Sequence, residues 1–260
     1  MNNAELHPQK PKIAIGKIIV YSMSAFIAVF CIWLIFGQPK SNEGRSINFI
    51  IKPLPNNINF LTVLDLQQIT DTIIDKENFS KALCEQMLEQ NPYIRRAEVY
   101  QDLSGKIKCI VTQRKPIARI INANQTHFYL DEDGKKIPVL SGMSARVLVA
   151  NGYIGEKLLP SDTLKTKTLL AIYEISKFIE SELFWKQFTE QLYVDKYNDI
   201  CLIPKVGSFI IVVGNSDRIA EKFERLKVFI TMVLPKVGWE KYQKISVKFK
   251  NQIVTTKKEE

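Results

Sequence analysis

The chain has 260 residues, of which 46% are hydrophobic and 24% charged, and it carries a formal net charge of +9. This length suits two small domains but not a large catalytic core with additional modules. A basic balance suits anionic lipids, acidic proteins or nucleic acid, but the lysines and arginines are scattered without interleaved aromatic residues, so we expect no nucleic-acid partner.

An uncharged apolar run from Ile18 to Phe36 is the most informative segment near the N-terminus. As a helix rising 1.5 Å per residue it would be roughly 28 Å long, about the thickness of a bilayer's hydrocarbon core. We therefore expect a short tail over residues 1–12, a transmembrane helix over 13–37 and a linker over 38–46. A cleaved signal peptide is the alternative, but its apolar core would usually be about 7–15 residues and end at an A-x-A site.

The charges beside the apolar run predict its orientation. Lys10, Lys12 and Lys17 precede it, whereas Lys40 and Arg45 follow it with an acid between them. This bias favours a cytoplasmic N-terminus. The remaining chain would then lie across the membrane, in a periplasm or the extracellular space.

A compact α+β unit is expected directly after the linker. It begins with a strand over 47–52 and continues with helices over 62–75 and 78–89. Phe79, Leu83 and Met87 recur at helical spacing in the second helix and predict its buried face. Two strands, 97–100 and 106–113, then form a hairpin through Ser104-Gly105, so that the order is strand, helix, helix, strand, strand.

The cysteines do not form a disulfide framework. Cys31 lies in the apolar run, and Cys84, Cys109 and Cys201 lie outside it with no CxxC spacing. Cys84 shares a helical apolar face with Leu88, and Cys109 lies on an alternating strand. Two interpretations remain open, buried free thiols or a Cys84–Cys109 bridge between packed elements.

Lys115-Pro116 marks a joint, beyond which the chain becomes rich in strands. A long helix should bury Leu169, Ile172, Tyr173, Ile179 and Leu183, and a later one, with Ser216 as its N-cap, should bury Ile219, Phe223, Leu226, Ile230 and Val233. The strands expected around these helices cover residues 126–130, 135–140, 146–150, 191–195, 199–204, 208–213, 245–249 and 252–256.

No catalytic, cofactor-binding or metal-binding residue is predicted. The two histidines, His7 and His127, fall on opposite sides of the expected membrane helix, which excludes His-based triads and multi-His zinc sites. Asp131-Glu132-Asp133-Gly134 could hold calcium, but between two strand-like runs it fits a hairpin turn better. No glycine-rich phosphate loop or nucleophile elbow occurs. We therefore expect a protein that is not an enzyme, with no cofactor and no small-molecule substrate.

The last strand, Gln252 to Thr256, is the strongest candidate for a binding site. A terminal strand often lies at a sheet edge, where its unpaired N–H and C=O groups can accept a strand of another chain. The charged residues that follow, 257–260, could equally protect the edge against aggregation. Partner docking and a protected edge are both open on these residues alone.

Four short motifs follow one another along the chain. Leu88–Val99 reads L-x-x-x-P-hydrophobic-I-x-x-A-x-V, residues 111–118 read V-x-Q-x-x-P-x-A, and residues 130–134 read L-D-x-x-G. Gly214 is followed by Lys222-Phe223-Glu224-Arg225-Leu226. In this order, after a single membrane run, they resemble the FtsQ/DivIB family of bacterial division proteins. Gln113 stands where that family usually has an acid, and it puts charge-dependent docking at the domain joint in doubt.

The resemblance implies a fold of class α+β: one transmembrane helix, a POTRA domain (β-α-α-β-β) over 47–118, a mixed β-sheet domain with packed helices over 119–256, and a charged tail over 257–260. It also implies a divisome scaffold of the bacterial inner membrane, periplasmic beyond its anchor and enriched at the division site. FtsB-like and FtsL-like coiled-coil proteins would be its partners, with other divisome members possible at the POTRA domain. A POTRA-bearing transport or secretion protein is the first alternative, and an anchored periplasmic hydrolase the second. The implied partner-binding residues are Lys248, Phe249, Gln252, Ile253, Val254, Thr255 and Thr256.

Overall fold

The computed structural model describes residue 30 and residues 47–55, 59–74, 80–103, 105–124, 126–155 and 164–259. The chain divides into two compact units, residues 1–45 and 46–260. No helix among the described residues is long and apolar enough to cross a membrane. The expected tail, transmembrane helix and linker lie outside the described residues, except for Phe30.

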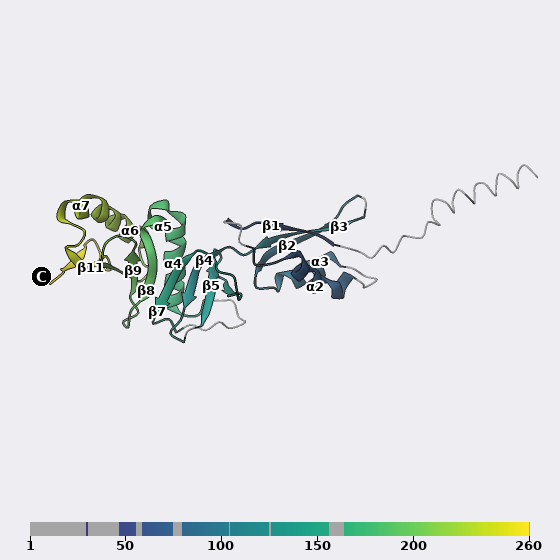
Figure 1. Ribbon diagram of the computed structural model, residues 1–260, viewed down its shortest axis with the longest axis horizontal. Helices are drawn as coiled ribbons and strands as arrows, with labels where there is room; N and C mark the ends of the chain where they lie inside the picture. The colour runs from purple at the N-terminus through teal and green to yellow at the C-terminus, as the bar shows by residue number, and fades with distance from the viewer. Residues whose placement is uncertain are drawn as a thin grey trace, which may run out of the picture. The chain divides into compact units, whose positions relative to one another are not determined.

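A three-stranded sheet with two helices forms the first part of the larger unit (Figure 1). Its strand order is β1-β3-β2, in which β1 (Ile47–Lys52) is parallel and β2 (Ile94–Gln101) antiparallel to the central β3 (Ile107–Gln113). Helices α2 (Val63–Ile74) and α3 (Lys81–Glu89) lie between β1 and β2 in the chain. The sequence-predicted order of strand, helix, helix, strand, strand is confirmed.

A nine-stranded mixed sheet forms the rest of the unit, with the order β12-β11-β10-β9-β8-β7-β4-β5-β6. The helices that accompany it are α4 (Lys167–Ser181), α5 (Leu183–Phe188), α6 (Ile219–Val228), the π-helical turn η2 (Phe229–Val233) and α7 (Leu234–Val237). The strands are β4 (Pro116–Ile121), β5 (His127–Asp131), β6 (Lys136–Pro138), β7 (Leu148–Gly152), β8 (Thr189–Val194), β9 (Ile200–Pro204), β10 (Ile210–Gly214), β11 (Tyr242–Ser246) and β12 (Val254–Lys257). The domain boundary expected between residues 118 and 119 falls inside β4, which pairs with β5 and β7 of this sheet.

The helices of this part are crossover connections. Strands β7 and β8 are parallel and are joined through α4 and α5, and β10 and β11 are parallel and are joined through α6, η2 and α7. Parallel neighbours require such connections because a tight turn cannot join them. The rings of Trp185 in α5 and Phe223 in α6 lie 4.7 Å apart, so both crossovers pack against each other over one face of the sheet (Figure 1).

Two hydrophobic clusters form the core of the unit. The larger one joins β4, β5 and the strands β7 to β11 with the inward faces of α4, α5 and α6. The smaller one contains the core of the three-stranded sheet, and Tyr129 and Ile137 of the nine-stranded sheet also belong to it. The ring of Phe60 lies 6.2 Å from that of Tyr129, so the smaller cluster is shared between the two sheets.

Of the two apolar faces predicted for α3, the one with Cys84 and Leu88 is the buried one. Cys84 and Leu88 are fully buried, whereas Leu83 is 41% exposed and Phe79 lies outside the described residues. The two stripes differ by one residue, a rotation of about 100°, and both satisfy the same i, i+4 spacing. Cys84, Cys109 and Cys201 are buried free thiols, which contradicts the bridged alternative.

Two helix predictions in the second part also require correction. The long helix ends at Ser181, and a non-helical Glu182 starts α5 in a new direction, which leaves Leu183 70% exposed. Ser216 is not the N-cap of α6; that position is Arg218, which has a left-handed backbone and no side-chain cap. After the π-helical turn η2, Leu234 rather than Val233 is fully buried.

Candidate functional site

Strand β12 lies at the edge of the nine-stranded sheet. It pairs with β11 in antiparallel register, with Ser246 opposite Val254 and Ile245 opposite Thr255. No other strand in the described part of the chain pairs with its outer side. Val254 is 44% exposed, while Ile253 just before the strand packs against the larger core cluster. The predicted edge position of the last strand is therefore observed, and the contact of Ile253 with the core holds the start of the strand on the sheet.

The hydrogen bonds of the strand indicate which backbone groups are free. Lys258 donates its N–H to the carbonyl oxygen of Lys241, the residue before β11, at 3.1 Å. Alternate N–H groups of an extended strand point to opposite sides, so those of Thr256 and Val254 also point toward β11. The N–H groups of Thr255 and Lys257 therefore point away from the sheet, where a further strand could accept them.

Strand β2 is an edge strand of the three-stranded sheet, and side chains of this chain bind the N–H groups on its outer side. On β2, the N–H of Val99 is donated to Glu85 Oε1 at 2.7 Å and that of Ala97 to Glu89 Oε1 at 3.1 Å. Both carboxylates come from α3, which lies along that edge. Strand β12 has no such cover in the described part of the chain, so its edge is open by comparison.

The segment between β11 and β12 is held by long-range polar contacts. Lys248 Nζ forms an ion pair with Asp199 Oδ2 at 2.7 Å, and Arg225 of α6 donates to the carbonyl oxygen of Phe249 at 3.1 Å. The ring of Phe249 is 47% exposed, and Asn251 takes a left-handed backbone with φ of 59° at the turn. Gly214 allows this arrangement, because a Cβ there would lie 3.0 Å from Lys248 Cγ.

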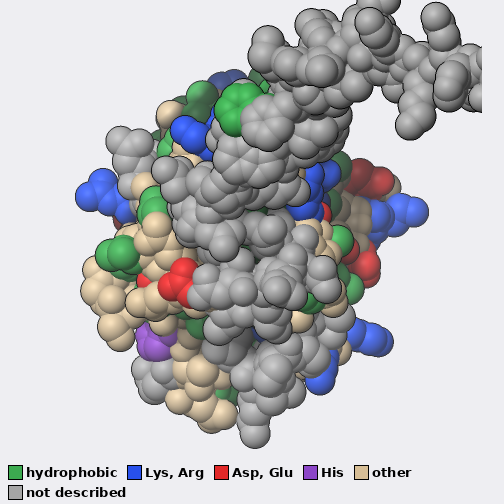
Figure 2. Space-filling model, turned by 90° about the vertical axis from the view of Figure 1, so that its right-hand side faces the viewer, with side chains coloured by type: hydrophobic (Ala, Val, Ile, Leu, Met, Phe, Trp, Pro, Cys, Tyr) green, Lys and Arg blue, Asp and Glu red, His purple; other side chains and the backbone are tan. Residues whose placement is uncertain are grey.

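The segment that contains the open edge is basic in sequence. Residues 241–260 contain six lysines and two glutamates, a net charge of +4. Lys258 Nζ is engaged with Glu240 at 3.0 Å and with Ser208 Oγ at 2.6 Å, and the hydrogen bonds from Ser208 and Lys258 lower the pKa of the Glu240 carboxyl. On the face drawn in Figure 2, which lies elsewhere, the coloured basic side chains are interspersed with acidic and apolar ones. The charge at the edge suits a partner segment with acidic residues.

The predicted partner-binding residues divide into two groups in space. Val254, Thr255 and Thr256 lie in β12, whereas Ile253 precedes it and Gln252 is an exposed residue between the turn and the strand. Two further predicted residues, Lys248 and Phe249, belong to the preceding turn beside α6. Lys257, which the predicted set omits, also belongs to β12.

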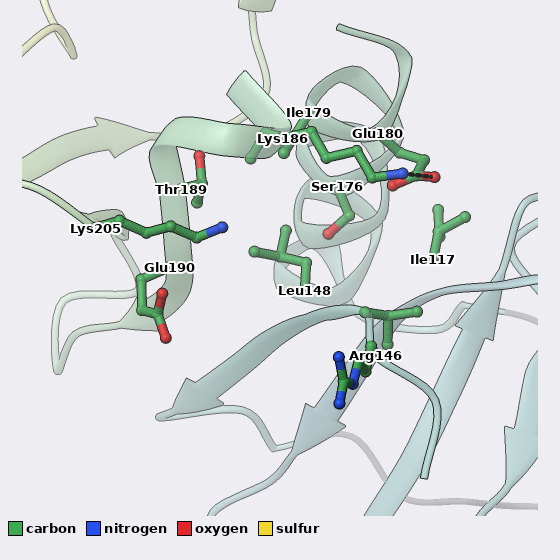
Figure 3. A pocket seen from close by; sticks show the side chains of 11 residues that line it. Ile117, Arg146, Leu148, Ser176, Ile179, Glu180, Lys186, Thr189, Glu190 and Lys205 are labelled. Carbon is green, nitrogen blue, oxygen red and sulfur yellow. Dashed lines mark hydrogen bonds and ion pairs between the residues drawn. The ribbon is translucent and has the colours of Figure 1, made fainter. Parts of the chain in front are cut away.

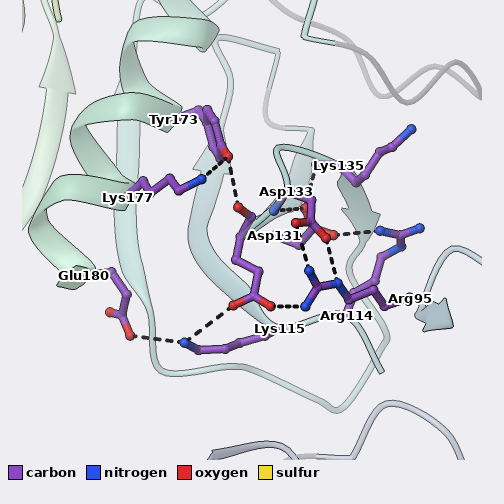
Figure 4. A network of polar contacts seen from close by, with 10 residues as sticks. Arg95, Arg114, Lys115, Asp131, Asp133, Lys135, Tyr173, Lys177 and Glu180 are labelled. Carbon is purple, nitrogen blue, oxygen red and sulfur yellow. Dashed lines mark hydrogen bonds and ion pairs between the residues drawn. The ribbon is translucent and has the colours of Figure 1, made fainter. Parts of the chain in front are cut away.

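A polar network joins the ends of the two sheets (Figure 4). Arg114 forms an ion pair with Asp131 at 2.9 Å, and Asp131 also accepts the N–H groups of Asp133 and Lys135 at 3.0 and 2.6 Å. Arg95 of β2 contacts Glu132 and Asp133 of the same turn. The predicted hairpin turn is confirmed, and its acids bind arginines of this chain. No cluster of potential metal ligands occurs in the described ranges.

Two internal roles were not visible in the sequence. Gln113 is buried, accepts the N–H groups of Phe60 and Leu61 at 2.8 and 3.2 Å, and donates to Asn59 Oδ1 at 3.0 Å. Lys222 is buried and donates to Asn215 O at 2.8 Å, and burial lowers the pKa of its ammonium group. The amide of Gln113 therefore holds a loop of its own chain, which gives this position a structural role.

Comparison with known proteins adds a family. The family model described as FtsQ/DivIB, C-terminal related, matches residues 115–256. The matched range begins one residue before β4 and ends within β12, so it covers the nine-stranded sheet up to its open edge. No curated protein matches the chain.

Proposed function

Because the chain belongs to the FtsQ/DivIB, C-terminal related family, which indicates a role in bacterial cell division, we propose that it is a non-enzymatic scaffold of the divisome. Its partners in this proposal are small single-pass coiled-coil division proteins of the FtsB and FtsL type. A segment of such a partner adds as a strand to the free side of β12 and brings septal peptidoglycan synthesis under the control of the assembly. Residues 47–113 serve as a POTRA domain that contacts other divisome members.

The open edge of β12 is the observation that carries this proposal. Strand addition supplies affinity through backbone hydrogen bonds, and the alternating outward side chains supply specificity. Val254 lies on this edge and Phe249 on the neighbouring turn, and both are exposed apolar side chains that a partner could cover. The surrounding lysines favour a partner strand flanked by acidic residues.

Location at the inner membrane belongs to the same proposal. The apolar run Ile18–Phe36 anchors the chain with its N-terminus in the cytoplasm and its folded part in the periplasm. Partners anchored in the same membrane then meet this edge at high effective concentration, so each contact can be weak and the assembly reversible.

A pair of proline substitutions tests the edge. Thr255→Pro removes an N–H that points away from the sheet, so the chain should fold while partner affinity falls by about tenfold or more. Thr256→Pro is the matched variant, because it removes an N–H that points toward β11 and should lower the melting temperature. The measurement is binding of the full-length chain to the FtsB-type protein of the source bacterium, together with thermal unfolding. Full affinity in a folded Thr255→Pro variant would refute strand addition.

A further inference from the structure

The tip of the hairpin between β2 and β3 carries the most exposed large apolar side chain among the described residues, that of Leu103. The turn is held without it: the N–H of Lys106 is donated to Asp102 Oδ1 at 3.0 Å, and the N–H of Gly105 to the Asp102 carbonyl oxygen at 3.0 Å. Gln101 Nε2 donates to the carbonyl oxygen of Gly105 at 2.9 Å. Turn tips usually carry small polar residues, so a leucine that this turn does not need calls for another explanation.

The surroundings of Leu103 are aromatic and basic. Tyr100 is 40% exposed and lies opposite Lys108, on the face of the sheet that points away from the buried cluster. Lys106 is exposed beside the tip. Residues 100–108 contain two lysines and one aspartate, and residues 37–46 contain one lysine, one arginine and one glutamate, so each segment has a net charge of +1. An exposed leucine accompanied by tyrosine and lysine is a composition that the interface between a membrane and water favours.

The hairpin projects from the end of the three-stranded sheet at which the chain enters it. Ile47, the first residue of β1, pairs with Ile107, and Gln101, the last residue of β2, pairs with the same residue. Only the ten residues 37–46 separate Ile47 from the apolar run Ile18–Phe36. Even a fully extended segment of that length spans at most about 36 Å, so an anchor in the membrane keeps this end of the sheet near the bilayer surface.

We propose that the β2–β3 hairpin docks on the surface of the bilayer that holds the anchor. Leu103 enters the interface between headgroups and acyl chains, Tyr100 lies at the depth of the headgroups, and Lys106 faces the phosphates of anionic lipids. These few side chains would hold an untethered domain only weakly, but the anchor gives the hairpin a high effective concentration at the surface. The contact fixes the orientation of the three-stranded sheet on the membrane. It rests on the membrane location proposed above and adds a second point of attachment to it.

Photo-crosslinking to lipid tests this contact. The full-length chain is reconstituted into vesicles of equal parts phosphatidylcholine and phosphatidylglycerol, with a benzophenone side chain in place of Leu103, Tyr197 or Phe30. Tyr197, on the turn between β8 and β9, is 73% exposed and is the matched control, and Phe30 lies within the apolar run. We expect lipid adducts, identified by mass spectrometry, at Leu103 and Phe30, and at least about tenfold fewer at Tyr197.

The outcomes separate the hairpin from the anchor. Adducts at Phe30 without adducts at Leu103 would overturn the hairpin contact and leave the anchor in place. Equal yields at Leu103 and Tyr197 would overturn the contact as well, because any exposed apolar side chain would then meet lipid. Absence of adducts at Phe30 would refute the membrane location and, with it, the hairpin contact.

Variants identify the side chains that make the contact. With the benzophenone at Tyr100, Leu103→Asp should lower the yield of lipid adducts by about tenfold and Lys106→Gln by about fivefold. Lys52→Gln removes the same charge at the far end of β1 and should leave the yield unchanged. Leu103→Asp should also keep the melting temperature of the parent chain, because the leucine side chain is fully exposed. Unchanged yields in the folded Leu103→Asp and Lys106→Gln variants would overturn the proposal.

Discussion

The ion pair between Arg114 and Asp131 should contribute strongly to the stability of the connection between the two sheets. Its side chains are only 16% and 1% exposed, and the Asp131 carboxylate also accepts two backbone N–H groups of its turn. The substitution Asp131→Asn preserves an oxygen for those two bonds. The carboxylate oxygen that faces Arg114 becomes the NH2 group of the amide, and the negative charge of the side chain is lost. The perturbation is therefore confined to the ion pair.

The magnitude follows from the burial of the pair. A hydrogen bond between charged groups contributes about 1.5–3 kcal/mol, and removing one partner of a fully buried pair costs about 3–5 kcal/mol. Arg114 retains some access to water, so we expect Asp131→Asn to lower the free energy of unfolding by about 2–3 kcal/mol. For a unit of this size that corresponds to a fall in melting temperature of roughly 4–12 °C.

Thermal unfolding of the full-length chain, followed by circular dichroism, measures this effect. Asp133→Asn is the matched control, because the Arg95–Asp133 pair is 43% and 41% exposed and should contribute less than about 1 kcal/mol. A double variant with Arg114→Met should lose little more than Asp131→Asn alone, because both changes break the same pair. Equal melting temperatures for the Asp131→Asn and Asp133→Asn variants would refute the reasoning.

Three further outcomes are expected. Gln113→Leu should lower the free energy of unfolding, measured by urea titration, by about 2–5 kcal/mol, because two buried N–H groups lose their acceptor. A loss below about 1 kcal/mol would contradict this expectation. Burial raises the pKa of Cys84 to about 11 and of Cys109 to about 12, from an ordinary value of 9.0, so unfolding releases protons above pH 9. The free energy of unfolding should therefore fall as pH rises from about 9 to about 12. In a variant with both cysteines replaced by alanine, the fall should be less steep. Ser176→Ala should leave the melting temperature unchanged or raise it, since it removes a hydroxyl without a partner; a clear decrease would show that this hydroxyl is satisfied in the free protein.

Local patterns predicted much of the fold. Alternation between Ile47 and Lys52 predicted β1 with its observed bounds, and the Asp131–Gly134 run predicted a turn in which Gly134 has a φ of +77°. The position of the last strand suggested the sheet edge that β12 occupies. In each case the signal lies within a few residues of the feature, where backbone preferences decide the outcome.

Features that depend on distant residues could not be predicted. The sequence indicated two apolar stripes of the same spacing on α3, and its packing beside β2 decides that the one with Cys84 and Leu88 is buried. The role of Gln113 rests on bonds to residues 52 and 53 positions earlier, and Lys222 reaches back across the start of α6 to Asn215. A groove beside α4 is likewise lined by residues of several elements that lie far apart in the chain (Figure 3).

Site-specific photo-crosslinking in the source bacterium tests the central claim most directly. Crosslinking residues would be placed at Phe249 and Val254, which are exposed on the β11–β12 turn and the open edge, and at Glu174 on the exposed side of α4 as a control. A small single-pass coiled-coil division protein captured at the first two positions and not at Glu174 is the predicted result. Absence of any adduct at Phe249 and Val254, or the same adducts at all three positions, would contradict a partner strand at the β12 edge.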